Sequence, residues 1–286
     1  MGLTLKKIKN VLGLDVPADL KRLQARTEAS CKTLAGVLLK SRAQDTALDE
    51  TPWFERIEAR RSVVYAKTDQ VRILDFGSER TDDSISKGQM EAGREKMLIV
   101  GEHAKHSSKK PKWAAVLFNL IRGFKFKSCL ELGTCMGISA SYESAALKLN
   151  RQGGKLYTLD AVDAFQGVAR DGFAQMGLSE HVQTVLGRFS DALPGVLPLG
   201  PFDYAFIDGH HDEFATVQYF DQIHPHLTSR ALVVFDDIGW SDGMRRAWDK
   251  IRRDPRISLT VGMGGMGLAL IDPEIEGHPH FDIGLD

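Results

Sequence analysis

The chain has 286 residues, of which 43% are hydrophobic and 26% are charged, as expected for a globular protein with one large domain or one domain and an extension. Its 37 Lys and Arg residues nearly balance 38 Asp and Glu residues, which argues against nucleic acid as a partner because nucleic-acid-binding domains are usually clearly basic. Three cysteines are too few for a disulfide framework, and no apolar run approaches the roughly 20 residues that span a bilayer.

Residues 1–112 are rich in charge and are predicted to form a mainly helical extension. Their start lacks a signal-peptide core and cleavage site, so we expect a cytoplasmic protein. A short amphipathic helix is expected before Pro17 and a second helix after it, and residues 61–76 are expected to hold a strand or a small hairpin. The polar residues 77–112 could lie over a site as a lid. The extension could instead form the interface of a homo-oligomer, and the sequence does not choose between the two roles.

From residue 113 onward the pattern changes to helices that alternate with short apolar strands. Strands are predicted at 128–132, 155–159, 182–186, 202–207, 231–235, 257–261 and 267–271, and helices at 113–121, 139–149, 162–176 and 242–251. Alternation at this spacing implies a largely parallel sheet with helices on both faces. We therefore predict an α/β fold for residues 113–286, with a Rossmann-like, mostly parallel seven-stranded sheet that ends in an antiparallel hairpin. In such sheets ligands bind beyond the carboxyl ends of the strands.

A glycine-containing turn, ELGTCMGISA (131–140), follows the first of these strands. Gly133 would let the chain turn sharply beside a ligand, and Gly137 would let the next helix pack close to the strand. The spacing is not the GxGxxG fingerprint of dinucleotide-binding enzymes, which argues against a nicotinamide oxidoreductase. Asp160 ends the next strand, at the position from which an acidic residue accepts hydrogen bonds from ribose hydroxyls. The third strand is followed by GRFSDALP (187–194), which is suited to flanking a purine.

The first of these segments resembles the initial cofactor motif, ELGxxxGxS, of catechol and caffeoyl-CoA O-methyltransferases, and GRFSDALP is similar to their third motif. The resemblance covers roughly residues 113–271 and implies a class I S-adenosylmethionine-dependent methyltransferase. It implies that Asp160 holds the ribose and that Arg188 and Phe189 border the adenine. The methionine part of the cofactor would be lined by Gly133, Thr134, Gly137 and Ser139. The full cofactor-binding set that the resemblance implies is Glu131, Gly133, Thr134, Gly137, Ser139, Asp160, Arg188, Phe189 and Asp208.

Carboxylates also follow the fourth and fifth strands of the parallel part, where Asp208, Asp236 and Asp237 are expected to meet at one rim. Carboxylates brought together repel one another unless a cation neutralises them, and oxygen ligands suit magnesium. The pattern FIDGHH (206–211) followed by an Asp pair resembles metal-dependent O-methyltransferases, including bacterial enzymes that act on macrolide sugars, and implies a Mg²⁺ site on the three aspartates. The lysine base of catechol-type enzymes is absent, so the resemblance implies His211 as the general base and His210 as the second candidate. Alternatively, the aspartates shape the cofactor site, cap a helix or bind water without a metal.

The sequence therefore predicts a methyltransferase that uses S-adenosylmethionine and magnesium to methylate a hydroxyl group of a small molecule, such as a sugar or a natural product. One alternative is metal-independent N- or C-methylation with the same cofactor. Another is a methyltransferase-like binding module without activity, against which the set Gly133, Gly137, Asp160 and Asp208 argues, because nothing else in the fold requires all four. The acceptor is not specified, because acceptor pockets in this fold are built from N-terminal segments and loops that match nothing specific here.

Overall fold

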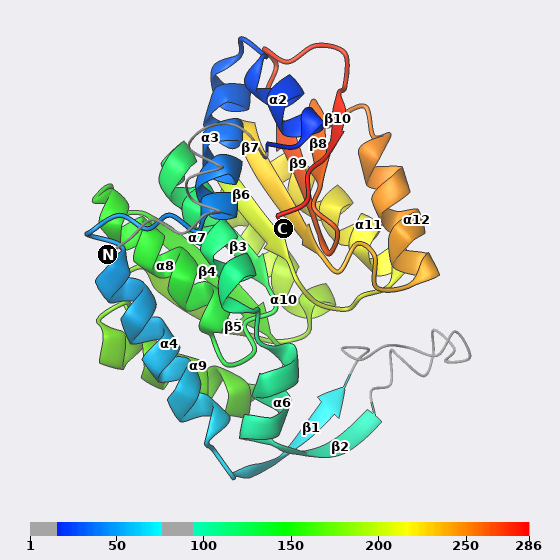
Figure 1. The fold of residues 1–286 in the computed structure, drawn as a ribbon. Coiled ribbons are helices and arrows are strands. Elements are labelled where there is room, and N and C mark those ends of the chain that lie inside the picture. The colour runs from blue at the N-terminus through cyan, green and yellow to red at the C-terminus, as the bar shows by residue number, and fades with distance from the viewer. Residues whose placement is uncertain (1–15, 76–93, 286) are drawn as a thin grey trace.

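The computed structural model describes residues 16–75 and 94–285. The helix expected before Pro17 and much of the polar segment 77–112 lie outside these residues. A twisted eight-stranded sheet forms the centre of the molecule, in the order β10-β8-β9-β7-β6-β3-β4-β5 (Figure 1). Its strands are β3 (Ser128–Leu132), β4 (Lys155–Asp160), β5 (Val182–Leu186), β6 (Phe202–Ile207), β7 (Leu227–Asp236), β8 (Leu259–Gly262), β9 (Met266–Ile271) and β10 (His280–Asp282).

The parallel part of the sheet contains β3 to β7, and the antiparallel hairpin β8–β9 is attached to β7 through β9. The predicted mostly parallel sheet with its terminal hairpin is thus confirmed. All seven expected strands are present, and β10 adds an eighth by pairing in parallel with β8 at the edge. Because β3 lies between β4 and β6, the turn that follows β3 sits at the middle of the carboxyl edge.

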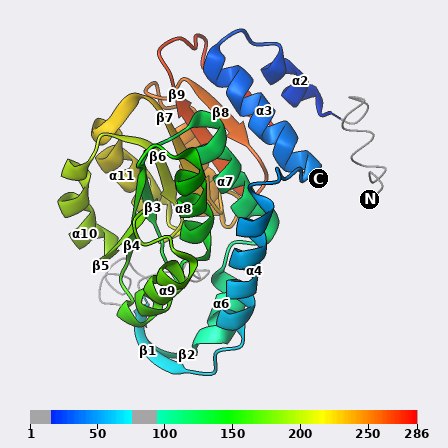
Figure 2. The same ribbon diagram turned by 90° about the vertical axis from the view of Figure 1, so that its left-hand side faces the viewer.

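Helices cover both faces of the sheet because successive side chains of each strand point to opposite sides. Cys129 of β3 packs into the core under α7, α8 and α9, whereas the next residue, Leu130, packs into the core under α10, α11 and α12. Figure 2 shows the sheet between these two layers. The helices are α7 (Pro111–Phe124), α8 (Ile138–Asn150), α9 (Asp163–Met176), α10 (Phe189–Val196), α11 (Glu213–Ile223) and α12 (Asp242–Arg252), with single 3-10 turns at Leu197–Leu199 and His224–His226.

The described part of the N-terminal extension is mainly helical, as expected. Its elements are α2 (Ala18–Gln24), α3 (Ala29–Ala43), α4 (Thr51–Tyr65), β1 (Gln70–Asp75), β2 (Arg94–Ile99) and α6 (Val100–Ser107). The helix expected after Pro17 is two helices, α2 and α3. Leu20, Leu34 and Leu38 of these helices are fully buried in the same core as α7 and the strands β8 and β10. The Asp19 carboxylate also accepts a hydrogen bond from the backbone N–H of Asp282, which ties α2 to β10.

The strand expected within residues 61–76 is β1, and its antiparallel partner is β2, from the segment that was expected to be a polar lid. This two-stranded sheet lies away from the main sheet, beneath α6 (Figure 1). Ile73 of β1 packs with Val64 of α4, Ala104 of α6 and Phe165 of α9 in a small separate core. Within the described residues, no helix is both long and apolar enough to cross a bilayer.

Candidate active site

A cavity of about 1260 Å³ opens above the carboxyl ends of the parallel strands. Its wall is formed by the turns after β3, β4, β6 and β7, by the start of α10, and by the segment between α6 and α7. Of the residues predicted from the sequence, eleven line it: Gly133, Thr134, Ser139, Asp160, Arg188, Phe189, Asp208, His210, His211, Asp236 and Asp237. Glu131 and Gly137 do not line the cavity, and they lie behind the turn.

Gly133 allows the turn after β3 to pass close to the end of β6. Its φ is 117°, and a Cβ atom built on it would lie 1.9 Å from the carbonyl oxygen of Asp208. The turn is held by hydrogen bonds from the backbone N–H groups of Gly133 and Thr134 to the carbonyl oxygen of Leu159. Any side chain at position 133 would therefore collide with the adjoining strand end.

Gly137 fulfils a different requirement, because it is the residue directly before α8 and has a φ of 76°. A Cβ atom there would lie 2.8 Å from the Ala169 Cβ atom and from the Phe173 ring. This glycine thus lets α8 begin against α9, and it shapes the cavity by packing without lining it. Ile138 and Ser139, in the first turn of α8, line the cavity, and the first N–H groups of a helix have no partner within the helix.

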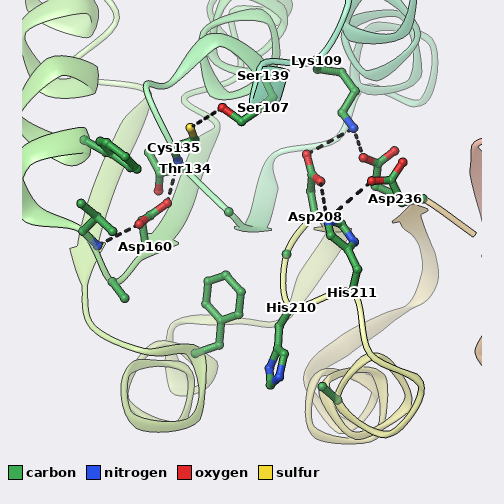
Figure 3. Close-up of a pocket in the computed structure, with 18 of the residues that line it drawn as sticks. Ser107, Lys109, Thr134, Cys135, Ser139, Asp160, Asp208, His210, His211 and Asp236 are labelled. Atoms are coloured by element: carbon green, nitrogen blue, oxygen red, sulfur yellow. Dashed lines mark hydrogen bonds and ion pairs between the residues drawn. The ribbon is translucent and has the colours of Figure 1, made fainter. Parts of the chain in front are cut away.

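Asp160 at the end of β4 fixes the conformation of this turn. One carboxylate oxygen accepts a hydrogen bond of 2.7 Å from the backbone N–H of Cys135, and the other accepts one of 2.9 Å from the backbone N–H of Val162. Burial raises the pKa of Asp160, while these two hydrogen bonds oppose the rise. The carboxylate keeps acceptor capacity toward the cavity that it lines (Figure 3).

Glu131 lies fully buried beneath the turn. Its carboxyl group accepts a hydrogen bond from the Thr158 hydroxyl, which is itself 2.7 Å from the Thr134 hydroxyl. Burial raises the pKa of Glu131 to about 8, and hydrogen bonds from Ser139 and Thr158 limit this rise. Glu131 was predicted to bind the cofactor, but the structure places it where it supports Thr134 and Ser139 from below.

The turn after β5 leads straight into α10, which begins at Phe189. Phe189 packs edge-on against Tyr219 of α11, with ring centroids 5.6 Å apart, and a Cβ atom on Gly209 would lie 2.9 Å from its ring. Arg188 and Phe189 both line the cavity.

Of the three aspartates predicted at the rim, Asp208 and Asp236 both contact Lys109, and Asp237 lies 3.6 Å from His211. Asp208 follows β6, and Asp236 ends β7 beside it. Lys109, from the segment between α6 and α7, reaches between the two (Figure 3). Its Nζ atom forms a hydrogen-bonded ion pair with Asp236 Oδ2 and lies 3.4 Å from Asp208 Oδ2.

The two neighbouring histidines point in different directions (Figure 3). His211 Nε2 lies 3.6 Å from Asp237 Oδ2 and 3.9 Å from Asp208 Oδ1, which places the ring in the acidic cluster. His210 turns away, and its Nδ1 atom is 2.9 Å from the Tyr219 hydroxyl. Burial lowers the pKa of His210. Of the two predicted bases, His211 is therefore the one that lies among the carboxylates.

Three residues of the cavity wall have backbone conformations that side-chain-bearing residues rarely adopt. The φ angles of Cys135, His210 and Asp237 are 45°, 54° and 52°. Each residue lies in the turn that follows β3, β6 or β7. A left-handed conformation costs roughly 1–2 kcal/mol at a non-glycine residue, and such residues cluster at functional sites.

Comparison with known proteins shows what the part of the chain around this cavity is similar to. Residues 130–238 match a family model described as a methyltransferase domain. These residues form a methyltransferase domain. They include the turn after β3, Asp160, and the acidic rim, so the resemblance to class I S-adenosylmethionine-dependent methyltransferases found in the sequence is confirmed.

Individual relatives of the methyltransferase domain share part of the chain. An O-methyltransferase of Aspergillus hancockii is 26% identical over 129 residues, and the match spans 44% of this chain and 49% of that protein, or about half its length. The O-methyltransferase of Bacillus cereus, solved with S-adenosylhomocysteine, superposes with a TM-score of 0.51 at 23% identity over 58% of this chain and 83% of that chain. A Podospora anserina methyltransferase gives a TM-score of 0.50 at 17% identity over 58% and 80%. The two structures support the fold.

The arrangement of the rim aspartates in the methyltransferase domain is not suited to bind the magnesium ion that was predicted from the sequence. Magnesium needs oxygen ligands at about 2.0–2.1 Å in near-octahedral geometry. The Lys109 ammonium group already contacts the oxygens of Asp208 and Asp236 that would face such an ion. Among residues 16–75 and 94–285, no three His, Cys, Asp or Glu side chains are grouped so that they could hold a metal ion together. A divalent ion at the rim would therefore depend on the same two carboxylates that Lys109 contacts.

Lys109 is one of the residues of the cavity wall that sequence analysis did not identify. It lies 127 positions from its partner Asp236, in a segment whose only recognisable feature is a lysine pair before Pro111. One signal was available: three clustered carboxylates require a cation, and the motif that supplies a lysine in catechol-type enzymes lacks one here. Tyr219 was also missed, since nothing in the sequence marks it as a neighbour of Phe189 and His210.

Proposed function

We propose that the protein is an S-adenosylmethionine-dependent O-methyltransferase that acts on a hydroxyl group of a small molecule. The observation that carries the proposal is a single cavity with two kinds of wall. The nucleoside-type residues Gly133, Asp160 and Phe189 lie on one side, and His211 lies with the carboxylates on the other. The similarity to an O-methyltransferase of Aspergillus hancockii supports oxygen as the methyl acceptor.

In this proposal the cofactor lies across the turn after β3. Asp160 accepts hydrogen bonds from the ribose hydroxyls, and Phe189 and Arg188 border the adenine. The first turn of α8 directs its N–H groups toward the methionine carboxylate, since a helix N-terminus favours an anion. The S-adenosylhomocysteine in the Bacillus cereus structure supports this choice of cofactor.

Methyl transfer then needs an acceptor oxygen in line with the carbon–sulfur bond of the sulfonium. The oxygen forms a bond to the methyl carbon, the carbon–sulfur bond breaks, and S-adenosylhomocysteine leaves. His211 Nε2 takes the hydroxyl proton, and Asp208 and Asp237 stabilise the imidazolium cation that results. No step is assigned to magnesium, because Lys109 holds the oxygens that would bind it.

The acceptor side of the cavity has an aromatic wall as well as an acidic floor. Trp113, Phe214 and Trp240 line it, and Phe214 and Trp240 are well exposed. Aromatic faces favour an acceptor with a flat or apolar body, such as a natural product, or the apolar face of a sugar ring. We further propose residues 113–286 as the catalytic domain and residues 1–112 as an extension that helps close the cavity, to which it contributes Lys109 and Leu74.

The test is calorimetric titration of S-adenosylhomocysteine into the wild type and two matched variants. Asp160 and Asp203 are both half-buried carboxylates that accept two backbone hydrogen bonds, but Asp203 does so at the amino edge of the sheet, from Lys127 and Ser128. Asp160→Asn should weaken binding at least tenfold, or about 1.4 kcal/mol, whereas Asp203→Asn should leave affinity unchanged. Equal effects of the two variants, or no binding by the wild type, would refute the assignment of the cofactor site.

A further inference from the structure

The acidic rim of the cavity is neutralised by a side chain of the same protein. Lys109 lies on the segment Ser108–Lys110 between α6 and α7, and only 13% of its side chain is exposed. Its Nζ atom contacts Asp236 and Asp208, and it lies 5.7 Å from the centroid of the ring of Phe206, a buried residue of β6. The lysine is therefore packed into the rim instead of extending into solvent.

The charges at the rim require such a cation. The side chain of Asp236 is 6% exposed, and that of Asp208 is 16% exposed. Two carboxylates so far removed from water and so close to each other repel, and they are stable as anions only beside a positive group. The neighbouring Lys110 is exposed, so the two adjacent lysines differ in their setting although they have the same side chain.

We propose that Lys109 takes the place of a divalent metal ion in this site. Its ammonium group and a divalent ion would use the same oxygens of Asp208 and Asp236 and would repel each other, so the two are mutually exclusive occupants. The wild-type protein consequently has no metal site at the rim, and removal of the lysine side chain creates one.

Lys109 is a positioning residue in this scheme. It holds Asp208, whose second oxygen faces His211 Nε2 at 3.9 Å, and through that carboxylate it sets the environment of the histidine. The role toward His211 rests on the proposed function. The exclusion of divalent ions does not, because it follows from the contacts of Lys109 alone.

The test measures direct uptake of Mn²⁺ by the full-length protein, from the loss of the electron paramagnetic resonance signal of the free ion. Wild type, Lys109→Arg and the matched control Lys110→Met should show no stoichiometric uptake. Lys109→Met should bind one ion per chain, at least tenfold more tightly than the wild type. The double variant with Asp236→Asn should lose that site again.

Two results would overturn the proposal. One is wild-type protein that binds Mn²⁺ at the rim as tightly as Lys109→Met does, with binding abolished by Asp236→Asn. The other is a Lys109→Met protein that has the circular dichroism spectrum and the cooperative melting of the wild type, and is therefore folded, but takes up no Mn²⁺. The parallel titration with S-adenosylhomocysteine separates this proposal from the proposed function, since failure to bind the cofactor product leaves the Mn²⁺ result unaffected. If Lys109→Met does not fold, the wild-type, Lys109→Arg and Asp236→Asn measurements still decide the question.

Discussion

Replacing Gly133 by alanine should damage both the fold and the cofactor site. A Cβ atom at this position would lie 1.9 Å from the Asp208 carbonyl oxygen, whereas real Cβ atoms essentially never approach a heavy atom closer than 3.0 Å. The ends of β3 and β6 would therefore have to separate by at least about 1.1 Å. That movement would stretch the hydrogen bond of 2.9 Å from the Asp208 N–H to the Leu132 carbonyl oxygen.

The expected loss of stability follows from two contributions. A φ of 117° at a residue with a side chain costs about 1–3 kcal/mol, and a weakened backbone hydrogen bond costs about 1 kcal/mol. The free energy of unfolding should fall by about 2–4 kcal/mol, which lowers the Tm by about 5–10 °C for a protein of this size. The affinity for S-adenosylhomocysteine should fall by roughly a hundredfold, because the displaced segment carries the cavity wall.

Gly153→Ala is the matched control for this change. Gly153 also has a positive φ, 68°, but a Cβ atom there would meet nothing within 4 Å. Its alanine variant should lose only about 1–2 kcal/mol of stability and should bind S-adenosylhomocysteine normally. Melting curves and calorimetry on the two variants separate backbone strain from the collision. Equal Tm values and equal affinities for the two would refute the argument that close approach to Asp208 requires glycine at position 133.

Two further predictions concern pH. Burial raises the pKa of Glu131 to about 8, above its unfolded value of about 4.3. Between these two pH values the folded state holds a proton that the unfolded state has released, so the free energy of unfolding falls as the pH rises from about 4.3 to about 8. In Glu131→Gln the Tm should depend less on pH between about pH 5 and 8, so the Tm of the variant should rise relative to that of the wild type as the pH increases. A Tm profile parallel to that of the wild type would contradict the raised pKa of Glu131. Burial lowers the pKa of His210 below its unfolded value of about 6.5, so the unfolded state binds more protons and stability is lost as pH falls through that value. His210→Gln should reduce the fall in Tm between about pH 7 and 5.5, and an unchanged slope would show that His210 is not buried as a neutral ring.

The central strands were predictable because each is a short apolar run that ends at glycine or aspartate. β3, β5 and β6 have the bounds expected from the sequence. β7 begins four residues earlier than expected, at Leu227, because its ladder with β6 starts at the pair Phe202–Leu227 although the residues that follow are polar. β10 was missed because three residues carry no periodic pattern, and its position depends on the edge that β8 offers.

Contacts between distant segments were not predictable from the pattern. β1 and β2 pair across residues 76–93, and the alternating charges of β2 resemble a polar loop. Within the site, the motif residues marked the carboxyl ends of the strands, and a parallel sheet places these ends along one edge. The sequence could therefore predict which motif residues lie near one another. The same reasoning could not place Lys109, since a single lysine before a helix has no preferred partner.

The left-handed residues Cys135, His210 and Asp237 carry a consequence for protein engineering. Each would gain stability if it were replaced by glycine, and to a lesser extent by asparagine, because these residues adopt a positive φ at lower cost. Selection for heat resistance alone should therefore favour substitutions at the turns that hold Asp160, His211 and Asp236 in place. A thermostable variant obtained in this way would have an intact fold but a poorly ordered cavity. Selection for function should therefore retain the strained conformations of these turns, although they lower stability.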